Sequence, residues 1–499
     1  MRILLINQYY PPDTAATGQL LSDVAAALAR NGHQVHVLCS TTSYDGRKSV
    51  SEQVQPDRKS PPHSNRLASM HAEAARARVS RRPPGVKDSR HRPRPADAAG
   101  RTPTQRPCAA QDNQSKDRSE SQGCVHVHRV TATNLGNATL AGRLLDYASF
   151  FLFATVRGVR LGRMDVCIAL TTPPYIGLIG SLLKRIRGTR LVLWTMDLYP
   201  EIAAACGIVR SSSLTYRVCA ALSRGLYRRA SAIISLGWCM TARLIEAGVN
   251  PHKIVAVDNW APGECVAPID RDDSRLRRGL GLNGQFTIMH AGNFGAGHHL
   301  HTLTRSLARI DRSRNWRIVF AGNTRSRDRF ARLASASNLT GVRLTPPVPL
   351  DRLSDSLAAG DVHVVSQKEG TQGLLVPSKI YGLMAAGRPI LFIGPAETEA
   401  AGLVRNSRCG LVIRPGDFVA TEAALRRLAE DLSHRRTMGA NARAYYLRHL
   451  GRDRSVRRIV RLVERVALPA ASPPSEAVDP TDSSPPPTPP RRQLHKPHP

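Results

Sequence analysis

The residue best placed to do chemistry in this sequence is Lys379, which follows Pro377 and Ser378 at the start of a short apolar stretch. Pro377 has the fixed φ that suits a first helical position and Ser378 can cap nearby amides, so a helix is predicted to begin here. A lysine in the first turn opposes the helix dipole by ~0.3–1 kcal/mol, whereas an anion bound there is favoured. A phosphate bound beside Lys379 would therefore explain a lysine at this position. The alternative is that Lys379 is a solvated lysine on an exposed first turn.

The elements around this lysine repeat along the chain. Gly387 and Pro389 end the predicted helix, and Ile390–Ile393 is typical of a buried parallel strand. Buried runs alternate with amphipathic stretches, which predicts an α/β protein with parallel sheets and right-handed crossovers. The predicted strands are 2–7, 34–39, 125–130, 165–170, 190–194, 232–236, 254–257, 286–290, 316–321, 342–344, 362–366, 390–393 and 409–413. The longer predicted helices are 15–30, 140–161, 214–230, 300–310, 326–337 and 350–359, with a helical region at 420–466.

Length and composition limit the classes of protein that the chain can be. At 499 residues it is too long for one ordinary domain, so we expect two domains plus irregular segments, with a charged linker near 262–278. The nine cysteines are scattered without metal or CxxC spacing, which favours reduced thiols in a cytoplasm over disulfides or zinc. We expect neither a signal peptide nor a transmembrane helix, because no apolar window approaches ~18–20 residues.

Much of the formal net charge of +33 lies in a segment without hydrophobic periodicity, at about residues 46–123. Arg, Pro, Ser, Asp and Gln dominate it, which predicts a disordered basic insertion. The Pro- and Ser-rich residues 468–499 predict a disordered tail. No aromatic interleaving or folded motif accompanies the basic runs, so we expect no specific nucleic-acid partner, and loose contact with an anionic surface is the alternative.

Several short stretches share their order and spacing with one enzyme family. They are residues 6–12, Gly18, 143–147, 170–174, 196–201, 259–261, 291–295 and 376–382. Through them the chain resembles the family-4 retaining glycosyltransferases of the GT-B class, and within these the bacterial polysaccharide members of the colanic acid or O-antigen type. The resemblance implies two Rossmann-like doubly wound domains facing a cleft. These would be an acceptor-binding domain at 1–264, a nucleotide-sugar-binding domain at 265–445 and a closing C-terminal helix at 446–467.

The resemblance also implies an activity, which is transfer of a sugar from a UDP- or GDP-linked donor with retention of configuration and without a metal or other cofactor. Lys379 would support the leaving diphosphate, and Asp197 would deprotonate the acceptor or stabilise the oxocarbenium-like transition state. A helix N-cap is the alternative for Asp197. The implied donor-binding residues are Gly18, Gly292, Asn293, Gly295, Glu369, Gln372, Pro377, Ser378 and Lys379. The implied acceptor-binding residues are Tyr10, Pro12, Thr172 and Glu201.

Some of these residues also have ordinary interpretations. Gly18 suits any loop between a strand and a helix, Glu369 and Gln372 suit a solvated loop, and His298 suits the surface as well as contact with phosphate or sugar. Two glutamates that the broader family carries eight positions apart are replaced by Leu374 and Gly382. The catalytic assignments are therefore less firmly supported by the resemblance than the fold is.

The acceptor implied by the resemblance is a polyprenyl-diphosphate-linked glycan at the cytoplasmic face of the plasma membrane. The helix 140–161 is apolar and aromatic with arginines near its ends, so it suits either a core helix or peripheral contact with an anionic membrane. Two other functions fit the same architecture. One is a UDP-sugar 2-epimerase, and the other is a non-catalytic scaffold that binds nucleotide sugars.

Overall fold

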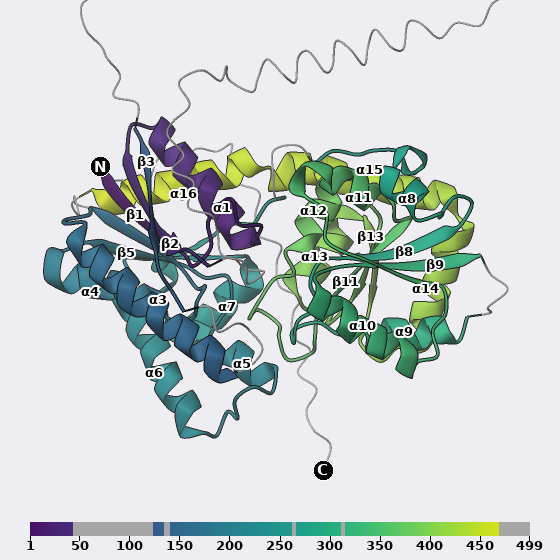
Figure 1. Cartoon of the computed structure of the whole chain (residues 1–499), viewed down its shortest axis with the longest axis horizontal. Coiled ribbons are helices and arrows are strands. Elements are labelled where there is room, and N and C mark those ends of the chain that lie inside the picture. Colours follow the sequence, from purple (N-terminus) through teal and green to yellow (C-terminus); the bar gives the residue numbers. More distant parts are fainter. Residues whose placement is uncertain (43–122, 134–139, 262–265, 311–314, 469–499) are drawn as a thin grey trace, which may run out of the picture. The chain divides into compact units, whose positions relative to one another are not determined.

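The computed structural model describes residues 1–42, 123–133, 140–261, 266–310 and 315–468. The predicted insertion and tail lie outside the described residues, apart from Gly123 and Leu468 at their edges. The described chain forms two parallel β-sheets with helices packed against them, and both sheets belong to one compact unit (Figure 1). The predicted α/β fold with two doubly wound sheets is therefore confirmed.

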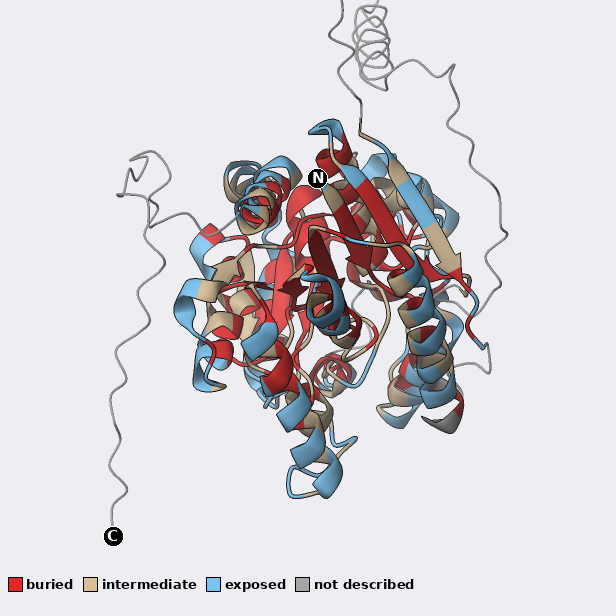
Figure 2. Ribbon diagram, turned by 90° about the vertical axis from the view of Figure 1, so that its left-hand side faces the viewer, coloured by how far each residue is buried: buried red, intermediate tan, exposed pale blue. Residues whose placement is uncertain are grey.

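The first sheet has seven strands in the order β3–β2–β1–β4–β5–β6–β7, and every pair is parallel. Its central strands are buried on both faces, as Figure 2 shows, and Ile3 pairs with Val35 on one side and Val166 on the other. The order reverses at β1, which is the pattern of a Rossmann-type sheet. The strands are β1 (Arg2–Ile6), β2 (Gln34–Ser40), β3 (Val125–Val130), β4 (Val166–Leu170), β5 (Arg190–Trp194), β6 (Ala232–Ser235) and β7 (Ile254–Ala256).

The helices of this part of the chain connect successive strands. The short α5 (Glu201–Ala205) was not predicted, because five residues leave no measurable period. The others are α1 (Ala16–Arg30), α3 (Leu140–Arg160), α4 (Gly177–Arg187), α6 (Leu214–Arg229), α7 (Trp238–Glu246) and the 3₁₀ turn η1 (Pro251–Lys253). Because parallel strands end at one edge of a sheet, the loops after β1, β4 and β5 meet there.

The second sheet repeats the pattern with six parallel strands in the order β10–β9–β8–β11–β12–β13. The strands are β8 (Phe286–Ala291), β9 (Trp316–Ala321), β10 (Val342–Thr345), β11 (Val362–Ser366), β12 (Ile390–Ile393) and β13 (Gly410–Ile413). The helices are α9 (His301–Ala308), α10 (Thr324–Ala336), η3 (Leu350–Arg352), α11 (Leu353–Ala358), α12 (Lys379–Ala385), α13 (Glu399–Ser407), α14 (Phe418–Glu430) and α15 (Leu432–Tyr445). The loops after β8 and β11 therefore share an edge with the start of α12.

The described part of the predicted linker is ordered, so the prediction of an irregular segment is wrong there. Residues 266–278 contain η2 (Arg271–Asp273) and the start of α8 (Arg275–Gly279). Arg277 is fully buried and donates 2.8 Å to the carbonyl oxygen of Ala359, and it forms an ion pair of 3.3 Å with the buried Asp361. The charge of Arg277 is thus neutralised against the second sheet.

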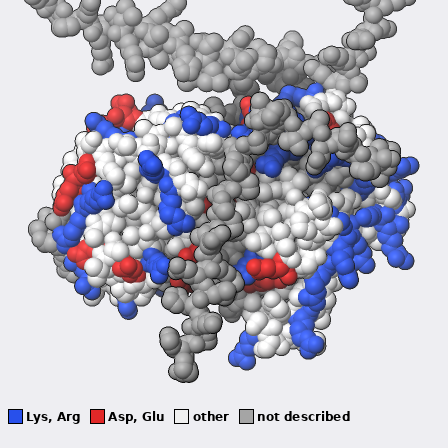
Figure 3. Space-filling model, turned by 180° about the vertical axis from the view of Figure 1, so that it is seen from behind, with Lys and Arg blue, Asp and Glu red and all other residues white. Residues whose placement is uncertain are grey.

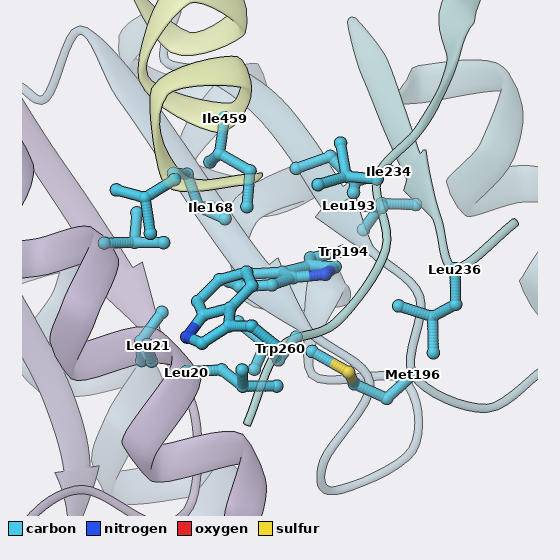
Figure 4. Close-up of a cluster of buried hydrophobic side chains, with 14 of the residues drawn as sticks. Leu20, Leu21, Ile168, Leu193, Trp194, Met196, Ile234, Leu236, Trp260 and Ile459 are labelled. Carbon is cyan, nitrogen blue, oxygen red and sulfur yellow. The ribbon is translucent and has the colours of Figure 1, made fainter. Parts of the chain in front are cut away.

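The end of the chain returns to the first sheet. After a π-helical turn, η4 (Tyr446–Leu450), the helix α16 (Arg452–Ala467) packs against α1, β4 and β5. Figure 4 shows Ile459 of α16 beside Trp194 of β5, with Trp260, Leu20 and Leu21 closing the same cluster. Arg452 also lies 3.6 Å from Asp23 of α1. The helix therefore completes the core of a sheet that begins at Arg2.

Candidate active site

Lys379 is the first residue of α12, and it is half-buried rather than solvated. Its Nζ lies 2.8 Å from the carbonyl oxygen of Asn293 and 2.9 Å from Nε2 of His298. Burial lowers the pKa of this lysine to about 7, because the ammonium form loses most of its hydration. The alternative of a solvated lysine on an exposed turn is therefore wrong.

The lysine side chain lies across the backbone of Gly292, the residue that follows β8. Gly292 has a φ of +118°, and a Cβ added there would lie 2.4 Å from Cε of Lys379. Its N–H donates to the carbonyl oxygen of Ala321 at the end of β9 over 2.7 Å. Both the backbone conformation and the space over it thus require a glycine.

The loop after β8 uses most of its amides within the protein. The N–H of Phe294 donates to the hydroxyl of Ser326 over 3.0 Å, and the N–H of Gly295 donates to Nδ1 of His298 over 3.2 Å. The side-chain oxygen of Asn293 accepts a hydrogen bond from the N–H of Asn323, in the loop after β9. The N–H groups of Gly292, Phe294 and Gly295 are therefore already donated within the protein.

His298 differs from its predicted place at the surface, because both of its ring nitrogens contact the site through Gly295 and Lys379. Burial and the neighbouring Lys379 hold the pKa of this histidine well below its usual value. The signal available in the sequence was its position three residues after Gly295, in the loop between a buried strand and a helix. That signal gives no direction for the side chain.

The start of α12 differs from the prediction at two residues. Pro377 precedes the helix, and Ser378 is its N-cap without a capping hydrogen bond from the side chain. The backbone of Ser378 is already helical, with φ −59° and ψ −23°, whereas a capping side chain needs an extended N-cap. The predicted cap is therefore wrong. Gly387, with a φ of +63°, ends the helix as predicted.

Asp197 lies on the loop after β5, beside the loop that leads to α12. Its N–H donates over 3.1 Å to the hydroxyl of Thr171 at the end of β4. Asp197 forms an antiparallel bridge with Leu375, and the N–H of Leu198 donates over 2.9 Å to the carbonyl oxygen of Leu374. The structure thus brings the loop that carries Asp197 together with the loop that leads to Lys379 at the start of α12.

The environment of the Asp197 side chain is confined. It lines a small pocket of about 30 Å³ with Tyr175, Tyr199 and Tyr227, and burial raises its pKa to about 6. The helix that follows, α5, has Pro200 as its N-cap and no side-chain cap, so the alternative of an N-cap aspartate is wrong. A confined carboxylate whose pKa lies near neutral is suited to accept a proton.

Two of the four predicted acceptor residues lie in the segments that follow β4 and β5, with Thr172 in the loop after β4 and Glu201 at the start of α5. Glu201 lines a larger pocket of about 380 Å³ together with Tyr216, Arg243 and, from the loop before α12, Gly370. Its Oε2 is buried and has no hydrogen-bond partner in the described part of the chain. Thr172 is half-buried. This pocket therefore offers one predicted acceptor residue next to the loop that positions Lys379.

The other two predicted acceptor residues accompany Gly18 near α1. Gly18 is buried, and a Cβ added there would lie 3.0 Å from the carbonyl oxygen of Tyr9. Tyr10 is 8% exposed, whereas Pro12 is exposed. The close approach at Gly18 is thus made by the protein's own backbone, as in an ordinary loop between a strand and a helix.

The loop after β11 is held by groups that were not predicted. Nζ of Lys368 donates over 2.9 Å to the carbonyl oxygen of Ala205 at the end of α5. Nε of Arg243 donates over 3.1 Å to the carbonyl oxygen of Gln372. Glu369, between these two anchors, is exposed. The structure therefore places Glu369 and Gln372 on an anchored loop before α12.

One Asp-x-Asp triplet, Asp270 to Asp272, could offer two carboxylates to a divalent cation, but it serves a local purpose. The carboxylate of Asp270 caps η2 by accepting from the N–H of Asp272 over 3.0 Å. Across residues 1–42, 123–133, 140–261, 266–310 and 315–468, no three His, Cys, Asp or Glu side chains are grouped to hold a metal ion.

Residues 17–260 match the family described as glycosyl transferase 4-like domain, and residues 285–431 match glycosyl transferases group 1. A relative named glycosyltransferase WbjE, from Pseudomonas aeruginosa, is 29% identical over 60% of this chain and 74% of its own length. One named colanic acid biosynthesis glycosyl transferase WcaI, from Escherichia coli K12, is 24% identical over 64% and 79%. The chain belongs to the family-4 glycosyltransferases of the GT-B fold.

A solved structure supports the fold of this glycosyltransferase. Anabaena HepE in complex with UDP-glucose aligns with a TM-score of 0.59 at 15% identity, covering 93% of this chain and 100% of HepE. At that identity the likeness concerns the fold alone. The substrate that this glycosyltransferase uses has to be argued from its own residues.

The glycosyltransferase also presents a face formed by α3, α4 and α6, which pack in that order. Its exposed apolar side chains are Leu144, Leu145, Leu152, Phe153, Val156, Leu182, Ile186, Leu214, Val218 and Leu222. Its exposed basic side chains are Arg157, Arg160, Arg185, Arg187, Arg217, Arg224, Arg228 and Arg229. Seen from behind, Lys and Arg side chains also gather along the right-hand side of the molecule (Figure 3). No helix among the described residues is long and apolar enough to cross a membrane.

Proposed function

We propose that this glycosyltransferase moves a sugar from a nucleotide-diphosphate donor to a lipid-linked or glycan acceptor, with retention of configuration, in the biosynthesis of a cell-surface polysaccharide. The observation that carries the proposal is the half-buried Lys379 at the start of α12, which lies across Gly292 and follows the loop whose Leu375 bridges to Asp197. A cation and a carboxylate carried by these neighbouring segments match the two charges that develop when a diphosphate leaves and an acceptor hydroxyl loses its proton.

The donor side of the proposal rests on Lys379. An ammonium at the start of α12 would stabilise the negative charge that grows on the leaving diphosphate, so we propose that transfer needs no metal. HepE, which shares the fold, was solved with UDP-glucose, and this supports a nucleotide sugar as the donor. UDP-linked and GDP-linked sugars are the two candidate donor classes, and the binding experiment below includes both to decide between them.

The acceptor side rests on Asp197 and on the face formed by α3, α4 and α6. Asp197 would take the proton of the acceptor hydroxyl or stabilise the positive charge on the sugar ring, and Glu201 would bind the acceptor in its pocket. The apolar and basic side chains of the face suit anionic lipid, which favours a polyprenyl-diphosphate-linked glycan and a peripheral place on the membrane. The name of WcaI supports polysaccharide assembly.

Binding of nucleotide sugars, measured by calorimetry, tests the donor site. UDP-glucose and GDP-mannose would be titrated into the wild type, Lys379→Ala and a matched control, Lys184→Ala, which removes a lysine on α4 far along the chain. We expect one donor class to bind and Lys379→Ala to weaken it by ~2 kcal/mol or more, the value of a lost charged hydrogen bond. The control should bind as the wild type does. Absence of binding to both donors would refute the proposal and leave the scaffold without support as well.

The product distinguishes transfer from epimerisation. With a polyprenyl-diphosphate-linked glycan as acceptor, NMR of the product should show a new glycosidic bond with the anomeric configuration of the donor sugar. An inverted product would refute retention. Conversion of a free UDP-sugar into its 2-epimer without any acceptor would refute transfer, although the family and the names of both relatives favour transfer.

A further inference from the structure

The two ring nitrogens of His298 are both engaged, and the partners restrict where its proton can be. The N–H of Gly295 donates to Nδ1 over 3.2 Å, and Nζ of Lys379 lies 2.9 Å from Nε2. A backbone N–H can only donate, so Nδ1 must present its lone pair. A neutral imidazole then carries its proton on Nε2, and this N–H points at Nζ of Lys379.

This arrangement restricts the charge of the lysine. An ammonium has three donors and no acceptor, so it cannot receive a hydrogen bond from Nε2–H of His298. A neutral amine can, because its lone pair accepts from His298 while one of its own hydrogens is donated to the carbonyl oxygen of Asn293, 2.8 Å away. The contacts are thus mutually consistent when Lys379 is uncharged.

The other titratable and charged groups around the pair oppose a second positive charge. His290 of β8 is 2% exposed, donates from Nδ1 to the carbonyl oxygen of Val364 and has its ring centre 6.1 Å from that of His298. Arg329 of α10 lies 4.6 Å from the centre of the Phe294 ring, and Phe294 belongs to the same loop as His298. Burial also favours the neutral amine, because it lowers the pKa of Lys379 to about 7.

We propose that His298 is a positioning residue that holds Lys379 as a neutral amine, and that a nucleotide diphosphate bound beside Lys379 draws one proton from solvent onto this amine. The inference rests on the proposed donor site and specifies its charge. The proton adds to the lone pair that accepted from His298, so the hydrogen bond between them breaks and Nε2–H becomes free to donate to a phosphate oxygen. Donor affinity should therefore fall as pH rises above the pKa of Lys379.

Calorimetry in buffers of different ionisation enthalpy counts the protons taken up on binding. UDP-glucose and GDP-mannose are the probes, because a free nucleoside diphosphate titrates near neutral pH itself. We expect the wild type to take up close to one proton per bound donor near pH 8 and much less near pH 6, since the pKa of Lys379 is about 7. His298→Gln should bind with little uptake near pH 8, because the amide oxygen of glutamine accepts from an ammonium and keeps Lys379 charged.

Two further variants distinguish loss of proton uptake from a nonspecific effect of substitution. His301→Gln changes a histidine at the start of α9 that does not contact Lys379, and it should keep the uptake of the wild type. Lys379→Ala should lose both uptake and affinity. Binding by the wild type without proton uptake near pH 8 would overturn this inference alone and leave the donor site standing, and this measurement does not depend on how well His298→Gln folds. Failure of the wild type to bind either probe would overturn the inference together with the proposed function.

Discussion

At the residue scale, burial moves the two candidate catalytic groups toward one another in pKa. It raises the pKa of Asp197 to about 6 and lowers that of Lys379 to about 7, because in both cases it disfavours the charged form. Near pH 7 the carboxylate of Asp197 is therefore mostly ionised, while the lysine can gain or lose its proton. At this pH Asp197 can therefore accept a proton while Lys379 gains one on binding a diphosphate.

Asp197→Asn tests the carboxylate through activity and stability together. As a proton acceptor Asp197 should contribute ~10²–10⁴-fold, so kcat/KM should fall by that factor, and the wild-type rate should rise with pH through about 6. Because the folded pKa is raised, the carboxylate costs no stability well below pH 3.8, where both folded and unfolded forms are protonated; the cost builds up between pH 3.8 and about 6 and stays constant above that. The variant should thus melt higher than the wild type near pH 8, and the difference should disappear as the pH falls below 3.8.

The control for this prediction is Asp351→Asn, which neutralises an exposed aspartate of η3 and should change neither quantity. Full activity of Asp197→Asn would show that Asp197 takes no part in the reaction. A melting temperature lowered near pH 8 would show instead that the ionised carboxylate is stabilised by its surroundings.

The sequence supports some residue assignments and cannot support others. Lys379 could be singled out because a lysine in a first helical turn opposes the dipole, and this conflict is readable without coordinates. The contact with His298 could not, because the direction of a loop side chain depends on backbone angles that no spacing encodes. The same holds for the amides of Phe294 and Gly295, which look available in the sequence and are bonded within the protein.

At the scale of elements, buried parallel strands were the easiest to predict. Arg190–Trp194, Trp316–Ala321, Val362–Ser366 and Ile390–Ile393 have the bounds expected from their apolar runs. Short helices and helices of mixed polarity were missed. In α8, for example, Arg277 is buried although an arginine in a sequence is expected at the surface. The unpredicted α13 begins with Glu399, whose carboxylate accepts from the N–H of Cys239 over 3.4 Å and thereby joins two helices from distant parts of the chain.

The face formed by α3, α4 and α6 gives the prediction at this scale. Reversing Arg160 and Arg185 to glutamate should lower partitioning onto vesicles of anionic and zwitterionic lipid on the order of ten- to a hundredfold, since each basic residue near such a surface contributes about 1 kcal/mol. Both side chains are exposed, so the fold should be unaffected. Co-sedimentation with vesicles measures the effect.

The matched control reverses Arg325 and Arg332 on α10, which makes the same change in net charge elsewhere. If both double variants lose binding equally, net charge rather than this face is responsible. Unchanged binding of the Arg160 and Arg185 double variant to the vesicles would show that this face does not contact the membrane.

At the scale of the whole molecule, the fold is closed by its last helix. One buried cluster includes Ile3 of β1, Ile380 of α12 and Val463 of α16, so residues from the beginning, middle and end of the described chain share one core. Glu464 of α16 lies 3.0 Å from Nε2 of His33, next to the start of β2. The apolar period of this helix was readable in the sequence, but which sheet it covers was not, because a hydrophobic stripe does not specify its partner.

Ile459→Ala tests this closure. Ile459 is fully buried between α16 and the first sheet, so its truncation should reduce the free energy of unfolding by ~2–5 kcal/mol, as cavity-forming substitutions of this size do. Amide hydrogen exchange should rise in β1 and β5, more than 260 residues earlier in the chain, and rise less in β10 at the far edge of the second sheet. Leu447→Ala, which shortens a side chain that is 62% exposed in η4, is the control and should cost less than ~0.5 kcal/mol. Equal exchange in both sheets would mean that the two unfold as a single cooperative unit, whereas faster exchange confined to α16 would mean that the helix is dispensable to the sheet it covers.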